Sequence, residues 1–382
     1  MADVSVIGLY ILDVLGRPVT AIPERGGVGF IDEIRLTVAG TAGGTVVDAA
    51  KLGLSCLAVG AVGCDEKADW VLGALGRHGV DTTHMQRLKG VPTSATILAI
   101  QPDGSRPALH QRGASDHFEV ADADLDAVLA PPIVHLGGTG LLARLDGERS
   151  VALLREAKRR GRTVTFDLIA ANEGTGALVD PLLPFIDAFM PSIEEAEAMS
   201  GRRGPEDCAR HYLDLGATAC VFTLGAEGAF YAHRDGARLQ KPAWPVRVVD
   251  TTGCGDAFDA GWIAALHHGL DPEASLDVAQ AAAALVATGL GSDAGIVSWE
   301  DTRARIRAWR AEAGAASASA RSRIAAEAAP GSTWPRLRSP SFAARPRRAT
   351  RAAVASRPAS AACAAAISTP RSSAPAPAAA SA

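Results

Sequence analysis

Several features that mark particular classes of protein are missing from this sequence. Its six cysteines form no Cys-x-x-Cys pair, and no set of cysteines and histidines has the spacing of a zinc site. No stretch of about 18 residues is apolar enough to cross a membrane. The N-terminal apolar run has no basic start and is interrupted by Asp13, unlike a signal peptide. We therefore expect a cytoplasmic protein with reduced thiols and no membrane partner.

Lysine is scarce, because only five of the 38 basic residues are Lys, and none of the five follows a glycine. The sequence thus lacks the Gly-Lys-Ser/Thr of a P-loop, which excludes a P-loop kinase. Two glycine-rich segments, 138–143 and 289–294, weakly resemble a dinucleotide-binding loop. The region about 20 residues after the first is basic and has no acid ending a second strand, which argues against an NAD-linked oxidoreductase.

Charge is distributed unevenly along the 382 residues. Residues 313–382 contain ten Arg and one acid, Glu327, and carry +9, whereas residues 1–312 hold 28 basic and 41 acidic side chains and carry −13. The segment 313–382 is mainly Ala, Ser, Pro and Arg, with too few large apolar side chains to form a core. We expect a folded domain over 1–312 and a disordered tail over 313–382. The acidic domain and the dispersed Arg of the tail argue against nucleic acid as a partner.

Short apolar runs alternate with amphipathic segments through most of residues 1–312. The expected buried strands are 4–9, 55–62, 133–136, 163–166, 185–190 and 219–223. The expected helices are 45–52, 68–78, 147–160 and 194–199, with a last one over 301–311. This alternation predicts an α/β fold with a mainly parallel sheet and helices on both of its faces.

Two segments, 14–38 and 91–113, interrupt this alternation. They are punctuated by Gly and Pro and contain alternating apolar and polar residues, which indicates antiparallel strands. A small β-sheet appended to the main sheet is the natural interpretation, and such appendages often act as lids. Because ligands of open α/β sheets bind beyond the carboxyl ends of the strands, the functional residues are expected there.

The strongest functional signal is D-T-T-G-C-G-D-A-F-D-A-G at residues 250–261. It lies between a strand-like segment, 246–249, and a helix that extends to about His268. The small residues Gly253, Cys254 and Gly255 allow consecutive backbone N–H groups to point toward one place at the helix N-terminus. Such an arrangement predicts an anion hole, where the helix dipole favours developing negative charge.

Two side chains of this motif have alternative interpretations. Asp256 lies in the first helical turn, where an acid either caps the helix or serves as general base for a substrate hydroxyl. Cys254 is either an inert small residue or, because it lies at a helix N-terminus, a thiol whose thiolate is favoured.

The motif resembles the D-T-T-G-x-G-D-x-F-x-x-G signature of the ribokinase-like, or PfkB, family of carbohydrate and nucleoside kinases. The resemblance implies a three-layer αβα sandwich with a mainly parallel sheet and a small β-sheet lid. It also implies an ATP- and Mg²⁺-dependent phosphotransferase. Asp256 would deprotonate the acceptor hydroxyl, while the backbone of Gly253, Cys254 and Gly255 would stabilise the phosphoryl group.

Further segments resemble the family over about residues 3–300. Residues 223–228 (T-L-G-A-E-G) match its nucleotide loop, and residues 191–196 (P-S-I-E-E-A) match a block whose Glu, here Glu195, organises Mg²⁺. Asp250 and Thr252 resemble residues that hold a monovalent cation such as K⁺ in some relatives. The residues that the resemblance assigns to ATP binding are Ser192, Thr223, Gly225, Gly228 and Gln280.

On the substrate side, residues 8–13 resemble the family's G-x-x-x-x-D, which makes Asp13 a candidate for binding substrate hydroxyls rather than only a turn acid. Residues 39–44 resemble its G-G-x-x-x-N block, with Gly40 at the second glycine and Gly44 where Asn is usual. Arg112, on the second expected lid strand, is either a surface residue or a group that reaches a substrate carboxylate or phosphate.

The acceptor is therefore expected to be a small sugar or sugar-like molecule. Two alternatives stay open, namely a nucleoside kinase of the same fold and a non-catalytic regulator that binds a sugar or nucleotide. Because relatives often dimerise through the lid, a homodimer formed in this way is also an expectation.

Overall fold

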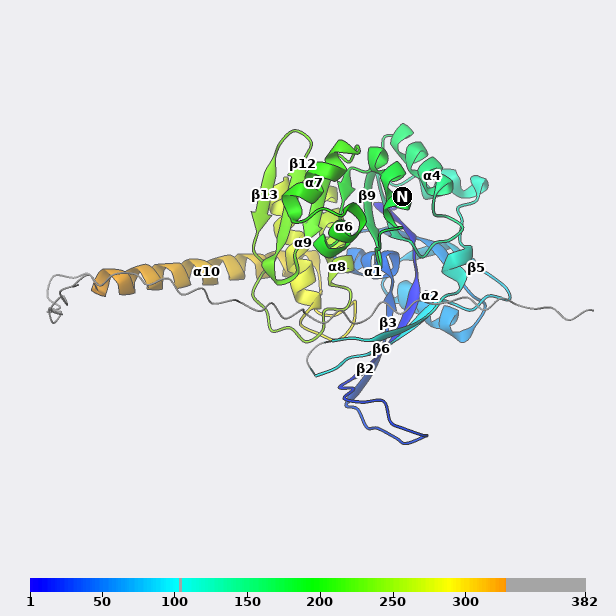
Figure 1. Cartoon of the computed structure of the whole chain (residues 1–382), viewed down its shortest axis with the longest axis horizontal. Helices are drawn as coiled ribbons and strands as arrows, with labels where there is room; N and C mark the ends of the chain where they lie inside the picture. Colours follow the sequence, from blue (N-terminus) through cyan, green and yellow to red (C-terminus); the bar gives the residue numbers. More distant parts are fainter. Residues whose placement is uncertain (103–104, 328–382) are drawn as a thin grey trace, which may run out of the picture. The chain divides into compact units, whose positions relative to one another are not determined.

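The computed structural model describes residues 1–102 and 105–327 (Figure 1). In this part of the chain the strands form one sheet of nine and one of four. The large sheet has the order β13-β12-β11-β10-β9-β8-β1-β4-β5, in which the pairs β11–β12 and β12–β13 are antiparallel and the other pairs are parallel. Its strands are β1 (Val4–Gly8), β4 (Cys56–Val62), β5 (Asp81–Arg87), β8 (Ile133–Thr139), β9 (Thr163–Leu168), β10 (Ala188–Phe189), β11 (Ala219–Thr223), β12 (Ala229–His233) and β13 (Arg238–Lys241). The predicted mainly parallel sheet is confirmed.

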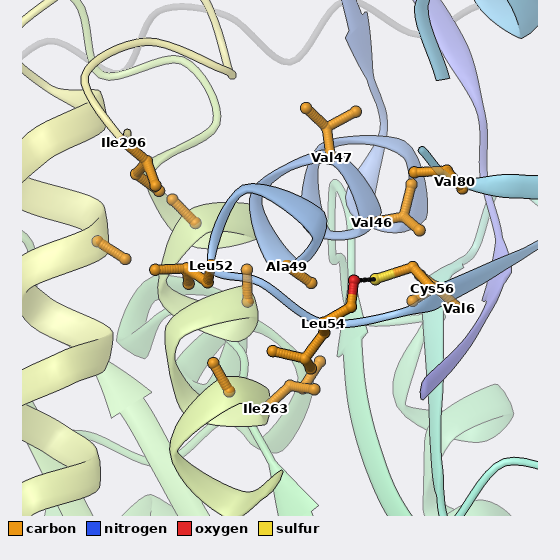
Figure 2. Close-up of a cluster of buried hydrophobic side chains, with 14 of the residues drawn as sticks. Val6, Val46, Val47, Ala49, Leu52, Leu54, Cys56, Val80, Ile263 and Ile296 are labelled. Atoms are coloured by element: carbon orange, nitrogen blue, oxygen red, sulfur yellow. Dashed lines mark hydrogen bonds between the residues drawn. The ribbon is translucent and has the colours of Figure 1, made fainter. Parts of the chain in front are cut away.

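Helices cover both faces of this sheet. They are α1 (Thr41–Lys51), α2 (Glu66–Arg77), α3 (Leu125–Val128), α4 (Glu148–Arg159), α5 (Gly176–Val179), α6 (Ile193–Ser200), α7 (Pro205–Asp214), α8 (Cys254–His267), α9 (Pro272–Val286) and α10 (Trp299–Glu327). The central strands are buried on both sides, so alternate residues enter two different cores. Val6 belongs to the core formed with α1, α2, α8 and α9, and Ile7 to the core formed with α4, α6 and α7. Figure 2 shows part of the first core, whose side chains include Leu52, the C-cap residue of α1, and Ile263 of α8. The three-layer αβα sandwich is thus confirmed.

The small sheet has the order β3-β2-β6-β7. Its strands are β2 (Ile11–Arg17), β3 (Glu33–Ala39), β6 (Ala95–Ala99) and β7 (Ala108–Gln111), with β2 and β6 parallel and the outer pairs antiparallel. The register places Thr37, Asp13, Thr96 and His110 in one row across the four strands. Since successive side chains alternate between faces, this row and the next, apolar row lie on opposite faces of the sheet. The predicted small β-sheet is confirmed.

The domain boundary expected at residue 312 stays a prediction. That position lies inside α10, which continues to Glu327, 15 residues into the segment assigned to the tail. Residues Met1–Ile324 form one compact unit, and the second unit, Ala325–Ala382, is described only over its first three residues. Residues 328–382 lie outside the described residues, so their expected disorder stays a prediction. Within the described ranges, no helix combines the length and apolarity that crossing a membrane requires.

Candidate active site

The N-terminus of α8 is a turn held by glycine. Gly253 is the N-cap residue and has a φ of 77°, a left-handed conformation that favours glycine. A Cβ added to it would lie 2.4 Å from Ser292 Cα, so a larger residue has no space either. No side chain of the described residues caps the helix through this position. The first-turn N–H groups therefore have no side-chain cap there, and their predicted role as an anion hole stays a prediction.

Asp256 lies in this first turn and faces α1. A Cβ on Gly44 would lie 2.3 Å from Asp256 Oδ2, so the Asp256 carboxylate can occupy this position only if residue 44 is glycine. The hydroxyl of Thr45 donates a hydrogen bond of 3.2 Å to the backbone oxygen of Asp256 and one of 2.6 Å to Thr41 O. The close packing of α1 on α8 thus positions the carboxylate, and Gly253 rather than Asp256 is the N-cap residue.

The pKa of Asp256 is raised from 3.8 to about 7. Burial is the main cause, and the carboxylate of Asp13 raises the pKa further, while Arg106 acts in the opposite direction. A carboxylate with a pKa near neutrality can take a proton from a hydroxyl and later release it, which is what a general base must do.

Asp13 lies on β2 in the row of polar side chains on the small sheet. It is 5% exposed, and its Oδ1 has no hydrogen-bond partner among the residues described. Burial raises its pKa to about 6, the hydrogen bond with Thr96 lowers it, and the charge of Asp250 raises it again. A buried carboxylate oxygen without a partner is costly, unless a ligand hydroxyl satisfies it. Its role in binding substrate hydroxyls stays a prediction from the sequence.

A cavity of about 440 Å³ adjoins the N-terminus of α8. Its volume falls in the range of small-molecule sites, which is about 300–1,000 Å³. Thr223, Gly225, Gly228 and Gln280, all predicted for ATP binding, line it together with Cys254 and Gly255 of the predicted anion hole, and Trp244, Val246, Val248 and Phe258 contribute apolar walls. One cavity therefore joins two sets of residues that are far apart in the sequence.

The pattern of the family called "pfkB family carbohydrate kinase" matches residues 1–299 of this chain. The chain belongs to the pfkB family of carbohydrate kinases. It is 31% identical to the 2-dehydro-3-deoxygluconokinase of Thermoproteus tenax over 286 residues, which is 71% of this chain and 86% of that protein. It is 26% identical to the ribokinase of Haemophilus influenzae over 281 residues, 70% of this chain and 87% of that one. A crystal structure from Escherichia coli that contains ATP and Mg²⁺ has a TM-score of 0.70 at 21% identity and covers 80% of this chain and 99% of its own. The predicted family and enzyme class are confirmed.

In this carbohydrate kinase, Ser192 and Glu195 form a capping box at the start of α6. Ser192 Oγ donates to Glu195 Oε2 at 2.8 Å, and the Glu195 N–H donates to Ser192 Oγ at 3.3 Å. Ser192 also forms an isolated parallel bridge with Thr223, so the start of α6 adjoins the residues of the predicted nucleotide loop. Burial raises the pKa of Glu195, and the hydrogen bonds from Ser192 lower it.

Two further carboxylates, Asp167 and Asp259, lie near Glu195. Asp167 directly follows the strand expected at 163–166, where the sequence predicts functional residues, whereas Asp259 was not predicted as a site residue. Burial raises the pKa of Asp167, and the charge of Glu195 raises it further. Asp167 Oδ1 and Asp259 Oδ2 have no hydrogen-bond partner within the described ranges. No three metal-binding side chains of residues 1–102 and 105–327 are grouped so that they could enclose an ion alone. This agrees with Mg²⁺, which usually binds one or two carboxylates together with substrate phosphates and water.

The kinase motif also contains Asp250 and Thr252, which the sequence assigns to a monovalent cation. Asp250 is 2% exposed, and its Oδ1 accepts hydrogen bonds from the N–H (3.0 Å) and the hydroxyl (2.8 Å) of Thr252. Its Oδ2 accepts one of 2.9 Å from the Gly291 N–H. The carboxylate therefore already accepts three hydrogen bonds from the chain itself.

Two arginines of the lid are placed differently. Arg112 is 57% exposed and forms an ion pair of 3.3 Å with Asp116. Arg106, which the sequence analysis missed, donates a hydrogen bond of 2.7 Å to Thr251 Oγ1, beside the anion hole. Its position between the two expected strands of the second lid segment is the signal that could have indicated it. The proposed contact of Arg112 with substrate stays a prediction.

Gly40 and Cys254 complete the predicted set. Gly40 is the N-cap residue of α1 with a φ of 85°, and an added Cβ would lie 2.5 Å from Leu9 O. This close approach seats the start of α1 beside the end of β1, whereas a contact with substrate stays a prediction. Burial raises the pKa of Cys254 to about 12, so burial outweighs the helix dipole and the thiol stays protonated.

Proposed function

We propose that this carbohydrate kinase transfers the γ-phosphate of ATP to a hydroxyl of a small sugar or sugar-like acceptor, with Asp256 as the general base. The observation that carries the proposal is the cavity of about 440 Å³, which joins the predicted nucleotide residues to the first turn of α8. Asp256 lies in that turn, and its pKa of about 7 suits proton transfer from a hydroxyl.

The chemistry follows from the groups around Asp256. The carboxylate takes the proton of the acceptor hydroxyl, whose oxygen forms a bond to the γ-phosphorus as the bond to the bridging oxygen of ADP breaks. The backbone N–H groups of Gly253, Cys254 and Gly255 donate to the oxygens that carry the charge, and one such donor is typically worth about 10²–10³ in rate. Asp13 holds and orients acceptor hydroxyls from the lid side.

Mg²⁺, when bound, neutralises charge on the phosphates. Glu195 and Ser192 are the residues that would hold it or its waters, and Asp167 and Asp259 have oxygens nearby that lack a partner among the described residues. The use of Mg²⁺ is further supported by the Escherichia coli structure of similar fold, which contains ATP and Mg²⁺. A monovalent cation at Asp250 and Thr252 stays a prediction from the sequence.

The acceptor belongs to the class used by the relatives, which include a 2-dehydro-3-deoxygluconokinase and a ribokinase. Both names describe polyhydroxylated substrates, and a carboxylate such as Asp13 binds hydroxyl donors of either. Gly44 leaves no side-chain amide on α1, so the acceptor must be matched largely from the lid side.

The test is an assay of ADP release over a panel that contains 2-dehydro-3-deoxygluconate, ribose, fructose and nucleosides. We expect at least one sugar or sugar acid to raise ADP release above the blank. Asp256→Asn should lower kcat by about 10²–10⁴, the usual contribution of a general base, while ATP binding measured by calorimetry is retained. Selective turnover of nucleosides would favour the nucleoside-kinase alternative. ATP or sugar binding without any turnover would favour the non-catalytic regulator and contradict the proposal.

We also propose that the lid mediates a homodimer. The row next to Asp13 on the lid contains Leu36, Val14, Ile97 and Leu109 in register. Ile97 is 58% and Leu109 73% exposed, and Ile34 on the same sheet is 70% exposed. A contiguous apolar face of this kind is unusual on a monomer and is typical of an interaction site.

A further inference from the structure

The loop Leu290–Asp293 connects the lid to the anion hole. On the side of the motif, the Gly291 N–H donates a hydrogen bond of 2.9 Å to Asp250 Oδ2. Ser292 lies directly against Gly253, where an added Cβ would come within 2.4 Å of Ser292 Cα. Because Gly253 begins α8, a shift of this loop would move the N–H groups that form the anion hole.

On its other side the same loop is fixed to strand β3 of the lid. Arg35 Nη1 donates to Leu290 O at 2.6 Å, and Arg35 Nη2 pairs with Asp293 Oδ1 at 2.8 Å. The Ser292 hydroxyl donates to Val38 O at 2.8 Å, and it is fully buried. Three contacts over four residues therefore attach the loop to one lid strand.

A second positively charged side chain reaches the loop from α1. Lys51, the last residue of this helix, donates from Nζ to the backbone oxygen of Asp293. Arg35 and Lys51 thus bind two backbone oxygens of one short loop, Leu290 O and Asp293 O, and neutralise the charge of Asp293.

These contacts bear on the monovalent cation predicted at Asp250 and Thr252. Such an ion binds through several oxygen atoms at once, and two backbone oxygens of this loop, Leu290 O and Asp293 O, already face the guanidinium or the ammonium group. Ala287 O, at the end of α9, accepts the N–H of Val249 at 2.8 Å. A further cation placed among these groups would be repelled by two positive charges of the chain.

We propose that Arg35 and Lys51 are positioning residues, which hold the loop Leu290–Asp293 and thereby the anion hole in place, so that turnover requires no monovalent cation. This inference rests on the proposed phosphoryl transfer. Because Arg35 is a residue of the lid strand β3, a movement of the lid would also move the loop and, through it, the anion hole.

The first experiment compares ADP release in potassium chloride and in tetramethylammonium chloride at equal ionic strength. The wild-type kinase should have the same kcat in both salts. Arg35→Ala and Lys51→Met should each lower kcat by about tenfold, less than the 10²–10³ of a lost anion-hole donor, with little change in KM for ATP. Arg35→Lys should recover part of the loss. Lys51→Met should be stimulated by K⁺ or NH₄⁺, which can replace the missing ammonium group.

Arg17→Ala is the matched control. Arg17 lies on the neighbouring strand β2 and forms an ion pair of 2.9 Å with Glu33 of β3, and its side chain is 36% exposed against 35% for Arg35. The substitution Arg17→Ala removes a lid ion pair of the same type but does not affect the loop Leu290–Asp293. The kcat and KM of this variant should therefore equal those of the wild type. An equal loss in Arg17→Ala would show a general effect of lid stability and overturn the proposal.

A second readout does not depend on turnover. Cys254 follows Gly253 and is partly buried, so its alkylation by iodoacetamide, followed by peptide mass mapping, reports on opening of the loop. Arg35→Ala should accelerate labelling of Cys254, and Arg17→Ala should not. Stimulation of the wild type by K⁺, or unchanged kcat and labelling in Arg35→Ala, would overturn the proposal. If no acceptor supports ADP release, the proposed function fails, and the labelling rates still decide the role of Arg35.

Discussion

The pKa of Asp256 makes a direct prediction for the pH dependence of catalysis. A general base must be ionised in the free enzyme, so kcat/KM should rise with pH and level off above about 7. Because Asp13 is the main charged group that raises this pKa, Asp13→Asn should move the rise to lower pH, besides weakening acceptor binding. The measurement is the pH profile of kcat/KM for both proteins, and a profile that does not respond to Asp13→Asn would contradict the assignment.

The same shift has a consequence for stability. The folded-state pKa of Asp256 lies above its ordinary value of 3.8, so between these values the folded protein keeps a proton that the unfolded chain has lost. The contribution of Asp256 to stability is therefore complete at low pH, falls as the pH rises to about 7 and is then constant. Relative to Asp256→Asn, the Tm of the wild type should decline over this interval. Thermal unfolding of the two proteins across pH measures the difference, and parallel curves would argue against a raised pKa.

At single residues, the sequence was informative where a motif fixes the chemistry. Cys254, Gly255 and the residues of the nucleotide loop are found around one cavity because small residues and turn signals specify their local conformation. Arg106 and Asp259 were missed, since their importance comes from contacts with residues that are distant in the chain. Burial of Cys254 could not be read from its place at a helix start, and it reverses the expected effect of the helix dipole.

At the scale of elements, a further prediction follows from the contact between α1 and α8. Gly44→Ala places a methyl group within 2.3 Å of Asp256 Oδ2 as the structure stands, so either the carboxylate or α1 must move. We expect kcat to fall by about 10²-fold, because a misplacement of about 1 Å at a reacting group has a cost of this order. Steady-state kinetics measure the change.

Gly73→Ala in α2 is the control for this substitution. Both glycines lie inside helices, but around Gly73 the nearest atom to an added Cβ is Arg77 Nη1, at 3.8 Å. Alanine should stabilise α2 by about 0.5–1 kcal/mol and leave kcat unchanged. If Gly44→Ala behaved in the same way, Asp256 would not depend on the close approach of α1.

The elements that were predicted are those with continuous apolar runs, such as β1 and β4, which are buried over their whole length. Strand β5 was not predicted, because its sequence D-T-T-H-M-Q-R is mostly polar and it lies at the edge of the sheet. The strand expected at 246–249 does not form. Val246 and Val248 line the cavity, and the Val249 N–H binds Ala287 O at the end of α9 instead of a neighbouring strand. An alternation of apolar and polar residues indicates that a segment is partly buried. The segment forms a strand only if the edge of a neighbouring strand is free to pair with it.

For the whole molecule, composition separates an acidic domain over 1–312 from a basic segment over 313–382, and this division stays a prediction. The helix α10 continues to Glu327, since Ala and Arg are strong helix formers even where no apolar stripe exists to be buried. A shift in composition therefore marks the loss of core-forming residues, whereas a helix that has already begun continues beyond it.

The state of assembly is the last prediction, and it depends on the apolar face of the lid. Ile97 and Leu109 face each other across β6 and β7, and both are exposed in the single chain. If a second copy covers this face, Ile97→Glu should place a charge in a desolvated interface and shift the protein to the monomer. Sedimentation velocity at several concentrations measures the shift. Thr83→Glu on β5 is the control, because this exposed position belongs to the edge strand of the large sheet and not to the lid, so it should leave the assembly unchanged. A wild-type protein that sediments as a monomer at all concentrations would contradict the dimer, while leaving the proposed chemistry at Asp256 unaffected.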